Sequence, residues 1–255
     1  MFNPYGYING RVRMMRVELL EQRSLDEVQN ATNYSEYLRQ LSETPLREDL
    51  GEATAQGAGL EQLDAALSRN YLRAVQRLRS IATGQPAQEI EALLLRYDLQ
   101  NVKTLVRGVL TGRGADDIVG GLIPAGTIPW AALQAAAQSS DVPSLAQTLS
   151  VAGGRIGGVL RGAVSGGATT SLDLEVALDQ GYYRAVLAGV RGNNVRRYFT
   201  REIDVRNLLI ARQLRGGPVV PRYFIPGGQG VGEGDFLRIA GGDNGTASDL
   251  APILE

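Results

Sequence analysis

Apolar side chains recur at intervals of three and four positions along most of the chain, which places them on one face of an α-helix. The clearest stripes are Ile8, Val12, Met15 and Leu19; Leu60, Leu63, Leu67, Tyr71, Ala74 and Leu78; and Leu95, Leu99, Val102, Val106 and Val109. Residues 24–27 have the Ser-x-x-Glu form of a capping box, which predicts a helix start at Ser24. The best strand candidate, residues 219–225, is interrupted by Pro221. The pattern therefore predicts an all-α fold.

Glycine pairs become frequent in the second half of the chain, where they mark expected loops and helix ends. Residues 227–234 are rich in glycine but lack the GxGxxG spacing of a dinucleotide loop. They also lack a lysine that could reach a phosphate. We therefore interpret this segment as a plain loop and expect no nucleotide cofactor.

Several segments of the first half recur in the same order about 100 to 110 residues later, which indicates internal repetition. The matching pairs are residues 96–108 with 201–216, 66–75 with 177–186, and 122–126 with 224–228. The first pair shares an aspartate three positions before an asparagine, followed by an apolar helix. The second pair shares Ala-Leu, Tyr and Arg-Ala-Val, and the third shares Ile-Pro and a later glycine.

The spacing of these pairs predicts a unit of about 105 to 110 residues, much longer than the ~34 to 47 residues of a helical solenoid repeat. It divides the chain into three expected domains, residues 1–112, 113–217 and 218–255. The third begins with its Ile-Pro segment but has no copy of the Tyr-Arg helix or of the Asp-x-x-Asn helix. By comparison with the first two domains, we expect this sequence to be a fragment that lacks about 70 residues.

Composition narrows the chemistry available to the chain. Its 255 residues include no cysteine and no histidine, which excludes thiolate nucleophiles, Cys/His metal sites and imidazole acid–base catalysis. The formal net charge of -1, with both signs interspersed, lacks the positive field of nucleic-acid binders. No window reaches the ~20 apolar residues that span a bilayer. We therefore expect a cytoplasmic protein without metal, cofactor or nucleic-acid partner.

Several segments resemble the C subunit family of V-type (A/V-type) ATPases and ATP synthases, the prokaryotic equivalent of the eukaryotic d subunit. The segments are YGYINGRVRMM (residues 5–15), LRQLSETPLREDL (residues 38–50) and the two Asp-x-x-Asn segments. Gly10 stands where the family usually has alanine, Leu46 where it commonly has tyrosine, and Gln213 where it often has a basic residue. The order and spacing of the segments along nearly the whole chain carry the resemblance, because no single motif is specific.

This resemblance implies an all-helical funnel of three similar domains around a pseudo-threefold axis, with no catalytic site of its own. It also implies a rotor subunit, present in one copy at the cytoplasmic face of a membrane complex. There it would link the central shaft, subunits D and F, to the membrane proteolipid ring and transmit torque during ion transport. The alternative is a helical scaffold or adaptor protein unrelated to an ATPase.

Two polar pairs are the first candidate functional residues. Asp98 and Asn101 lie three positions apart and face one side of a helix, as do their counterparts Asp204 and Asn207. We interpret each pair as a fastening inside its own lobe, with the carboxylate accepting amide or arginine hydrogen bonds. The alternative is an acid–base site formed by the two aspartates, which their placement in different domains disfavours.

The repeat also places Tyr71 and Arg73 in correspondence with Tyr182 and Arg184. We interpret these four as packing residues that define the repeat, with each arginine extending out of a helix interface. Contact with a partner is the secondary interpretation.

Two regions are candidates for partner contact. Arg11, Arg13 and Arg16 form either a solvated face or a contact for acidic residues of the shaft. Contact with the proteolipid ring needs an exposed apolar patch, for which residues 122–133 and the segment YFIPGG are candidates. Trp130, the sole tryptophan, lies in the first of these segments, and core packing is its alternative role.

Overall fold

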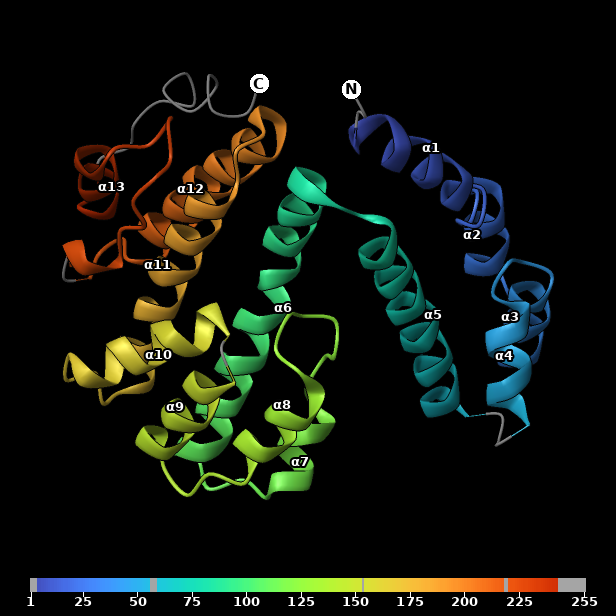
Figure 1. The fold of residues 1–255 in the computed structure, drawn as a ribbon, viewed down its shortest axis with the longest axis horizontal. Coiled ribbons are helices and arrows are strands. Elements are labelled where there is room, and N and C mark those ends of the chain that lie inside the picture. Colours follow the sequence, from blue (N-terminus) through green and yellow to red (C-terminus); the bar gives the residue numbers. More distant parts are fainter. Residues whose placement is uncertain (1–3, 56–58, 153, 218–219, 243–255) are drawn as a thin grey trace. The chain divides into compact units, whose positions relative to one another are not determined.

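The computed structural model describes residues 4–55, 59–152, 154–217 and 220–242 (Figure 1). Within these ranges the regular structure consists of α-helices and one 3-10 turn, with no strand, so the all-α prediction is confirmed. The chain divides into two compact units, Met1–Ala87 and Gln88–Glu255. The funnel of three domains stays a prediction. Among the described residues, no helix combines the length and the apolarity that a membrane crossing requires.

The first unit is built from five helices around a small core. The helices are α1 (Pro4–Arg16), α2 (Gln22–Gln29), α3 (Tyr34–Ser42), α4 (Arg47–Thr54) and α5 (Leu60–Ile81). The core cluster of this unit consists of Val28, Leu41, Leu50, Leu63 and Ala66. Hydrogen bonds from α5 to the buried carboxylate of Asp49 on α4 add to this small core.

Helix α2 begins at Gln22 and not at Ser24, so the predicted capping box is wrong. The N-cap residue is Glu21, whose side chain makes no capping hydrogen bond. The Glu27 carboxylate, which a capping box would turn back toward the helix start, instead binds the Arg23 guanidinium at 2.9 Å. This i,i+4 ion pair lies within the helix and competes with the capping geometry.

The predicted apolar stripe on α5 is only partly buried. Leu63 faces the core, whereas Leu60, Leu67 and Tyr71 are exposed. The side of α5 that meets α4 is partly polar, because the buried carboxylate of Asp49 on α4 accepts hydrogen bonds from two α5 side chains. Hydrogen bonds to Asp49 therefore help to determine which face of α5 is buried. The spacing of apolar residues alone predicts that face incompletely.

The second unit contains the longest helix and the main core. Its elements are α6 (Gly84–Leu110, which begins just before the unit boundary), α7 (Ala115–Gly120), α8 (Trp130–Ala137), α9 (Val142–Val151), α10 (Arg155–Ser165), α11 (Ser171–Gly189), α12 (Asn193–Gln213), η1 (Pro221–Tyr223) and α13 (Glu233–Ala240). The predicted stripe on α6 is confirmed, because four of its five members are buried and Val109 packs against them.

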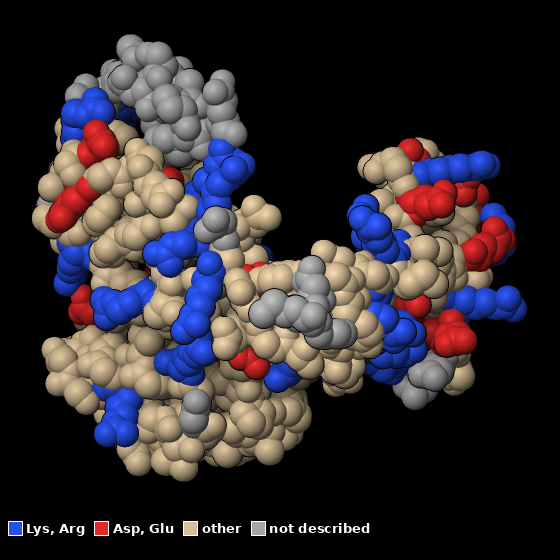
Figure 2. All heavy atoms as spheres, turned by 45° about the horizontal axis from the view of Figure 1, so that its top comes forward, with Lys and Arg blue, Asp and Glu red and all other residues tan. Residues whose placement is uncertain are grey.

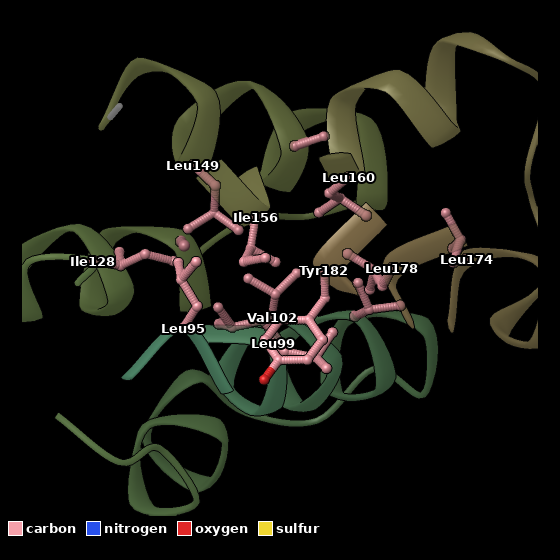
Figure 3. Packing of buried hydrophobic residues seen from close by; sticks show 14 of the residues in the cluster. Leu95, Leu99, Val102, Ile128, Leu149, Ile156, Leu160, Leu174, Leu178 and Tyr182 are labelled. Carbon is pink, nitrogen blue, oxygen red and sulfur yellow. The ribbon is translucent and has the colours of Figure 1, made fainter. Parts of the chain in front are cut away.

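The core of this unit joins α6 to the helices that follow it. Figure 3 shows Leu95, Leu99 and Val102 of α6 facing side chains from α9, α10 and α11, with Tyr182 among them. Helix α10 approaches α11 closely at Gly181, where an added Cβ would overlap the side chain of Val159. Since α6 packs into this core, the compact units divide at residues 87 and 88, and the predicted boundary at residue 112 lies inside the second unit.

Two ion pairs connect α6 to α11 beside the core. The ammonium of Lys103, the chain's sole lysine, lies 2.6 Å from the Asp179 carboxylate. The Arg107 guanidinium donates two hydrogen bonds to Glu175, at 2.7 and 2.6 Å. The bond from Arg107 lowers the pKa of the Glu175 carboxyl below its ordinary value, although partial burial opposes this. The contact between α6 and α11 is therefore stabilised by two ion pairs in addition to the apolar core.

Candidate functional site

The first Asp-x-x-Asn pair lies on α6 and binds the loop that leads into α8. The Asp98 carboxylate accepts hydrogen bonds from the N–H of Thr127, at 2.8 and 2.9 Å to its two oxygens, and from the N–H of Ile128 at 3.0 Å. It also accepts one from the Thr127 hydroxyl. The Asn101 amide donates to the carbonyl of Ile123 and accepts from the N–H of the same residue, both at 2.8 Å. These five residues form the first clasp.

The second pair, on α12, repeats this arrangement with the loop that leads into α13. The Asp204 carboxylate accepts hydrogen bonds from the backbone N–H groups of residues 229–231, at 2.8 to 3.1 Å. The Asn207 amide donates to the carbonyl of Ile225 at 2.8 Å and accepts from its N–H at 2.9 Å. These residues form the second clasp.

Burial makes both clasps costly to break. The exposed fractions are 1% for Asp98, 3% for Asp204 and 0% for both asparagines. A buried carboxylate is tolerated when hydrogen bonds replace its water shell, and backbone N–H groups of each loop supply them here. Each asparagine pairs with both backbone polar groups of one isoleucine, as a neighbouring strand would. The loops are therefore held by fixed, directional contacts.

One glycine in each loop permits the close approach of the aspartate. A Cβ added to Gly126 would overlap the carboxylate of Asp98, and a Cβ added to Gly228 would overlap the carboxylate of Asp204. Since the hydrogen bonds hold both carboxylates in place, a larger side chain cannot be accommodated by a simple rotation. The glycine that follows Ile-Pro in both loops is thus part of the clasp.

Both clasps lie within the second compact unit, and the prediction that each carboxylate accepts amide hydrogen bonds is confirmed. Each clasp helix binds a loop that follows it in the chain, across the predicted boundaries at residues 112 and 217. Those boundaries stay a prediction, and so does the assignment of each clasp to one lobe. Each aspartate is surrounded by the amides of its own loop, which leaves the acid–base alternative without support. Among the described residues, no group of three acidic side chains is placed to hold a metal ion.

The repeated tyrosine and arginine have different surroundings in the two copies. Tyr182 is buried and packs edge-on against two aromatic rings, and burial raises the pKa of its hydroxyl. Tyr71 is 40% exposed. Arg73 forms an ion pair with Asp49, whereas Arg184 is exposed. The shared sequence therefore marks equivalent helices but not equivalent contacts.

A polar contact between α6 and α12 escaped the sequence analysis. Arg96 donates a hydrogen bond to the Tyr198 hydroxyl at 2.7 Å and lies 3.4 Å from the Glu202 carboxylate. Burial lowers the pKa of Arg96, but the bond to Tyr198 and the charge of Glu202 outweigh it and raise the pKa above the ordinary value. The available signal was the arginine that opens the first Asp-x-x-Asn segment, two positions before Asp98.

The candidate partner residues lie at the surface. Arg11, Arg13 and Arg16 are exposed on α1, and none of them forms an ion pair with a described residue. Trp130 is the first residue of α8 and is 37% exposed, so it is not a core residue. Figure 2 shows basic and acidic side chains interspersed over uncharged surface on the face that it draws. This placement leaves all four residues accessible to a partner.

The sequence that forms these helices and clasps matches the model of a known protein family. The ATP synthase (C/AC39) subunit family matches residues 8–249. The chain belongs to this family. The resemblance found in the sequence is therefore confirmed, and the alternative of a scaffold unrelated to an ATPase is wrong.

Known C subunits align with most or all of this chain. The C subunit of the V-type ATP synthase of Deinococcus radiodurans is 48% identical over 257 residues, which cover 100% of this chain and 73% of the relative. The corresponding V-type protein of Thermus thermophilus is 30% identical over 255 residues, covering 98% of this chain and 76% of the relative. The C subunit of the A-type ATP synthase of Methanosarcina acetivorans is 30% identical over 210 residues, covering 80% of this chain and 57% of the relative.

Membership of the family fixes the general role. The chain is a subunit of a V/A-type ATP synthase, a membrane-associated complex, and is not an enzyme by itself. Its functional features are therefore surfaces that contact other subunits and the contacts that hold those surfaces in place.

Proposed function

We propose that the chain is a rotor subunit that links the central shaft, subunits D and F, to the membrane proteolipid ring. It works as a socket at the cytoplasmic face, in one copy per complex, and transmits torque during ATP-coupled ion transport. The observation that carries this proposal is the family match over residues 8–249, together with relatives that are C subunits of both V-type and A-type ATP synthases.

The two clasps fit a mechanical role. A coupling transmits torque only if its surfaces do not yield, and buried, fully directional hydrogen bonds resist displacement more than mobile surface contacts do. Each clasp ties a long helix to a loop that follows it in the second compact unit, through Asp98 and Asn101 in one case and Asp204 and Asn207 in the other. A load applied to either helix is thereby passed to the loop that it binds.

The exposed arginines of α1 are our candidate contact for acidic residues of the shaft. The double variant Arg13→Glu with Arg16→Glu should weaken binding of the full chain to shaft subunits by about tenfold at low salt, because exposed charges act over roughly 10 Å at 0.1 M salt. Pull-down at two salt concentrations measures this, and the difference from wild type should shrink at the higher one. Unchanged binding at both concentrations would exclude this contact. For the ring, the remaining candidate is Trp130, because Leu122, Ile128, Leu133 and Ile225 of the two segments expected to form an exposed apolar patch are buried.

A cross-linking experiment tests the rotor assignment. The full chain should co-purify with subunits D and F and with the proteolipid. A cross-link between the chain and the ring should leave ATP-driven ion pumping intact, because the two turn together. A cross-link between the chain and a catalytic head subunit should abolish pumping. The proposal fails if a cross-link to the ring blocks pumping or if the chain separates from both shaft and ring.

A further inference from the structure

The arginine of the repeated Tyr-x-Arg motif has a carboxylate partner in the first unit, whereas its counterpart in the second unit has none among the described residues. On α5, Arg73 forms an ion pair with Asp49 of α4, and Asn70 donates a 2.8 Å hydrogen bond to the same buried carboxylate. Arg184 is the counterpart of Arg73 on α11. Among the residues that the structure describes, no acidic group lies within ion-pair distance of Arg184.

An open groove lies beside Arg184, between α10 and α11. Its volume is about 630 Å³, and its lining includes Arg155, Gly158, Gly162, Gln180 and Arg184. A Cβ added to Gly158 or Gly162 would have no atom within 4 Å. Small side chains and absent Cβ atoms let a foreign backbone approach closely. In the first unit, the equivalent contact between α4 and α5 holds the Asp49 carboxylate instead.

The charged residues that line the groove are both arginines. The side chain of Arg155 reaches the end of α11, since its Nη1 would be 2.7 Å from a Cβ added at Gly189. Like Arg184, Arg155 has no ion-pair partner among the described residues. Both arginines that border the groove are exposed. Gln180 is occupied, because its amide donates to the backbone carbonyls of Arg222 and Phe224. Two unpaired guanidinium groups beside an apolar floor complement a helix that carries carboxylates.

We propose that the groove between α10 and α11 is a docking surface for an acidic helix of another subunit of the complex. One carboxylate of that helix pairs with Arg184, as Asp49 pairs with Arg73 in the first unit, and a second pairs with Arg155. The apolar face of the helix covers the floor at Gly158 and Gly162. The inference rests on the proposed function, because the partner comes from the assembled complex.

Two variants of the full chain test the docking surface. Arg155→Glu with Arg184→Glu reverses the charge of the groove, and Gly162→Leu fills it without a change of charge. Because Gly162 lies within α10 with open space around it, leucine should preserve or improve helix stability. Affinity is measured for ATP synthase membranes depleted of this subunit. Each variant should bind at least about tenfold more weakly than wild type.

Matched controls lie outside the groove. Arg113→Glu with Arg191→Glu makes the same charge change, and Gly234→Leu places leucine at an exposed helix glycine with nothing within 4 Å of its Cβ. Both should bind within about twofold of wild type. Circular dichroism melting of every variant verifies that the chain is folded.

The outcomes separate this inference from the proposed function. If wild type binds the depleted membranes and the groove variants bind equally well, the inference is overturned and the proposed function stands. If wild type itself fails to bind, the proposed function is overturned and the inference falls with it. If sedimentation shows that the free chain self-associates and that Gly162→Leu abolishes this association, the occupant is a second copy, which also overturns the inference.

Discussion

The two clasps make the same asparagine contact but use different donors for the aspartate. Asn101 and Asn207 each pair with the N–H and the carbonyl of one isoleucine, at 2.8 to 2.9 Å. Asp98 accepts from a threonine hydroxyl as well as from backbone amides, whereas Asp204 accepts from three consecutive amides. The repeat thus preserves a backbone arrangement, and the loop side chains vary around it.

The surroundings of the two clasp helices differ more. On α6, Lys103 and Arg107 follow the clasp residues and form ion pairs with α11. At the equivalent positions of α12 stand Leu209 and Gln213, both exposed. At these two positions the first clasp helix therefore has charge contacts that the second lacks. This difference predicts that similar substitutions have related but unequal effects.

Loss of either aspartate should have the largest effect. Asp98→Ala and Asp204→Ala each leave buried backbone N–H groups without acceptors, which should lower the free energy of unfolding by about 3 to 5 kcal/mol. Asp98→Ala should be the more damaging of the two, because it also orphans the Thr127 hydroxyl. Urea denaturation of the full chain measures both losses. Glu91→Ala, at an exposed position of the same helix, is the control, and an equally small loss for all three variants would contradict the burial argument.

Loss of the asparagines should have the next largest effect and should be equal at the two sites. Asn101→Leu and Asn207→Leu keep the side-chain volume but leave one N–H and one carbonyl of an isoleucine unpaired, at about 2 to 3 kcal/mol each. Hydrogen exchange of the Ile123 and Ile225 amides should accelerate in the corresponding variant. A difference above about 1 kcal/mol between the sites would show that the shared geometry hides unequal energies.

The threonine hydroxyl should distinguish the clasps. Thr127→Val removes the hydroxyl that donates to Asp98 while keeping the shape of the side chain, and should cost about 1 kcal/mol. The matched change in the second clasp, Gln229→Ala, should be within about 0.5 kcal/mol of wild type, since only the backbone of Gln229 binds Asp204. Thermal melting compares the pair. Equal effects would mean that the hydroxyl adds nothing to the backbone contacts.

The charge contacts beside the first clasp should give a small, pH-dependent effect. Because the pKa of Glu175 is lowered in the folded chain, its stabilising contribution is fully present above the unfolded pKa of ~4.3 and is lost as the pH falls through the lower folded value. Glu175→Gln should therefore cost about 0.5 to 1 kcal/mol at pH 7 and nothing below the folded pKa.

Gln213, which replaces Arg107 in the second repeat, supplies the control for this pH effect. Gln213→Ala should change stability equally at all pH values, since neither side chain titrates. A Glu175→Gln effect that persists at low pH would show that lost packing, and not charge, explains it.

The sequence predicted the helices and the polar character of the clasps better than it predicted their partners. The stripe on α6 follows from apolar spacing because both the spacing and the burial arise from one helix face. Which face of α5 is buried depends on the carboxylate of Asp49, far away in the sequence. The spacing of apolar residues gives no information about such a contact. The sequence identified the aspartates and asparagines because they recur. Their partners are mainly backbone groups, which every residue has, so the sequence could not identify those partners by residue type. Only the repeated Ile-Pro segments at residues 122–126 and 224–228 indicated where those partners lie.

The ion pair of Lys103 with Asp179 has a practical consequence for mapping this subunit inside its complex. The chain's one lysine side chain is 16% exposed and already engaged. Amine-directed cross-linkers, the common reagents for charting neighbours in large assemblies, will therefore find almost no side-chain target here. A sparse cross-link map would reflect the lack of reactive amines and not isolation of the subunit. Reagents for carboxylates or arginines suit this surface better.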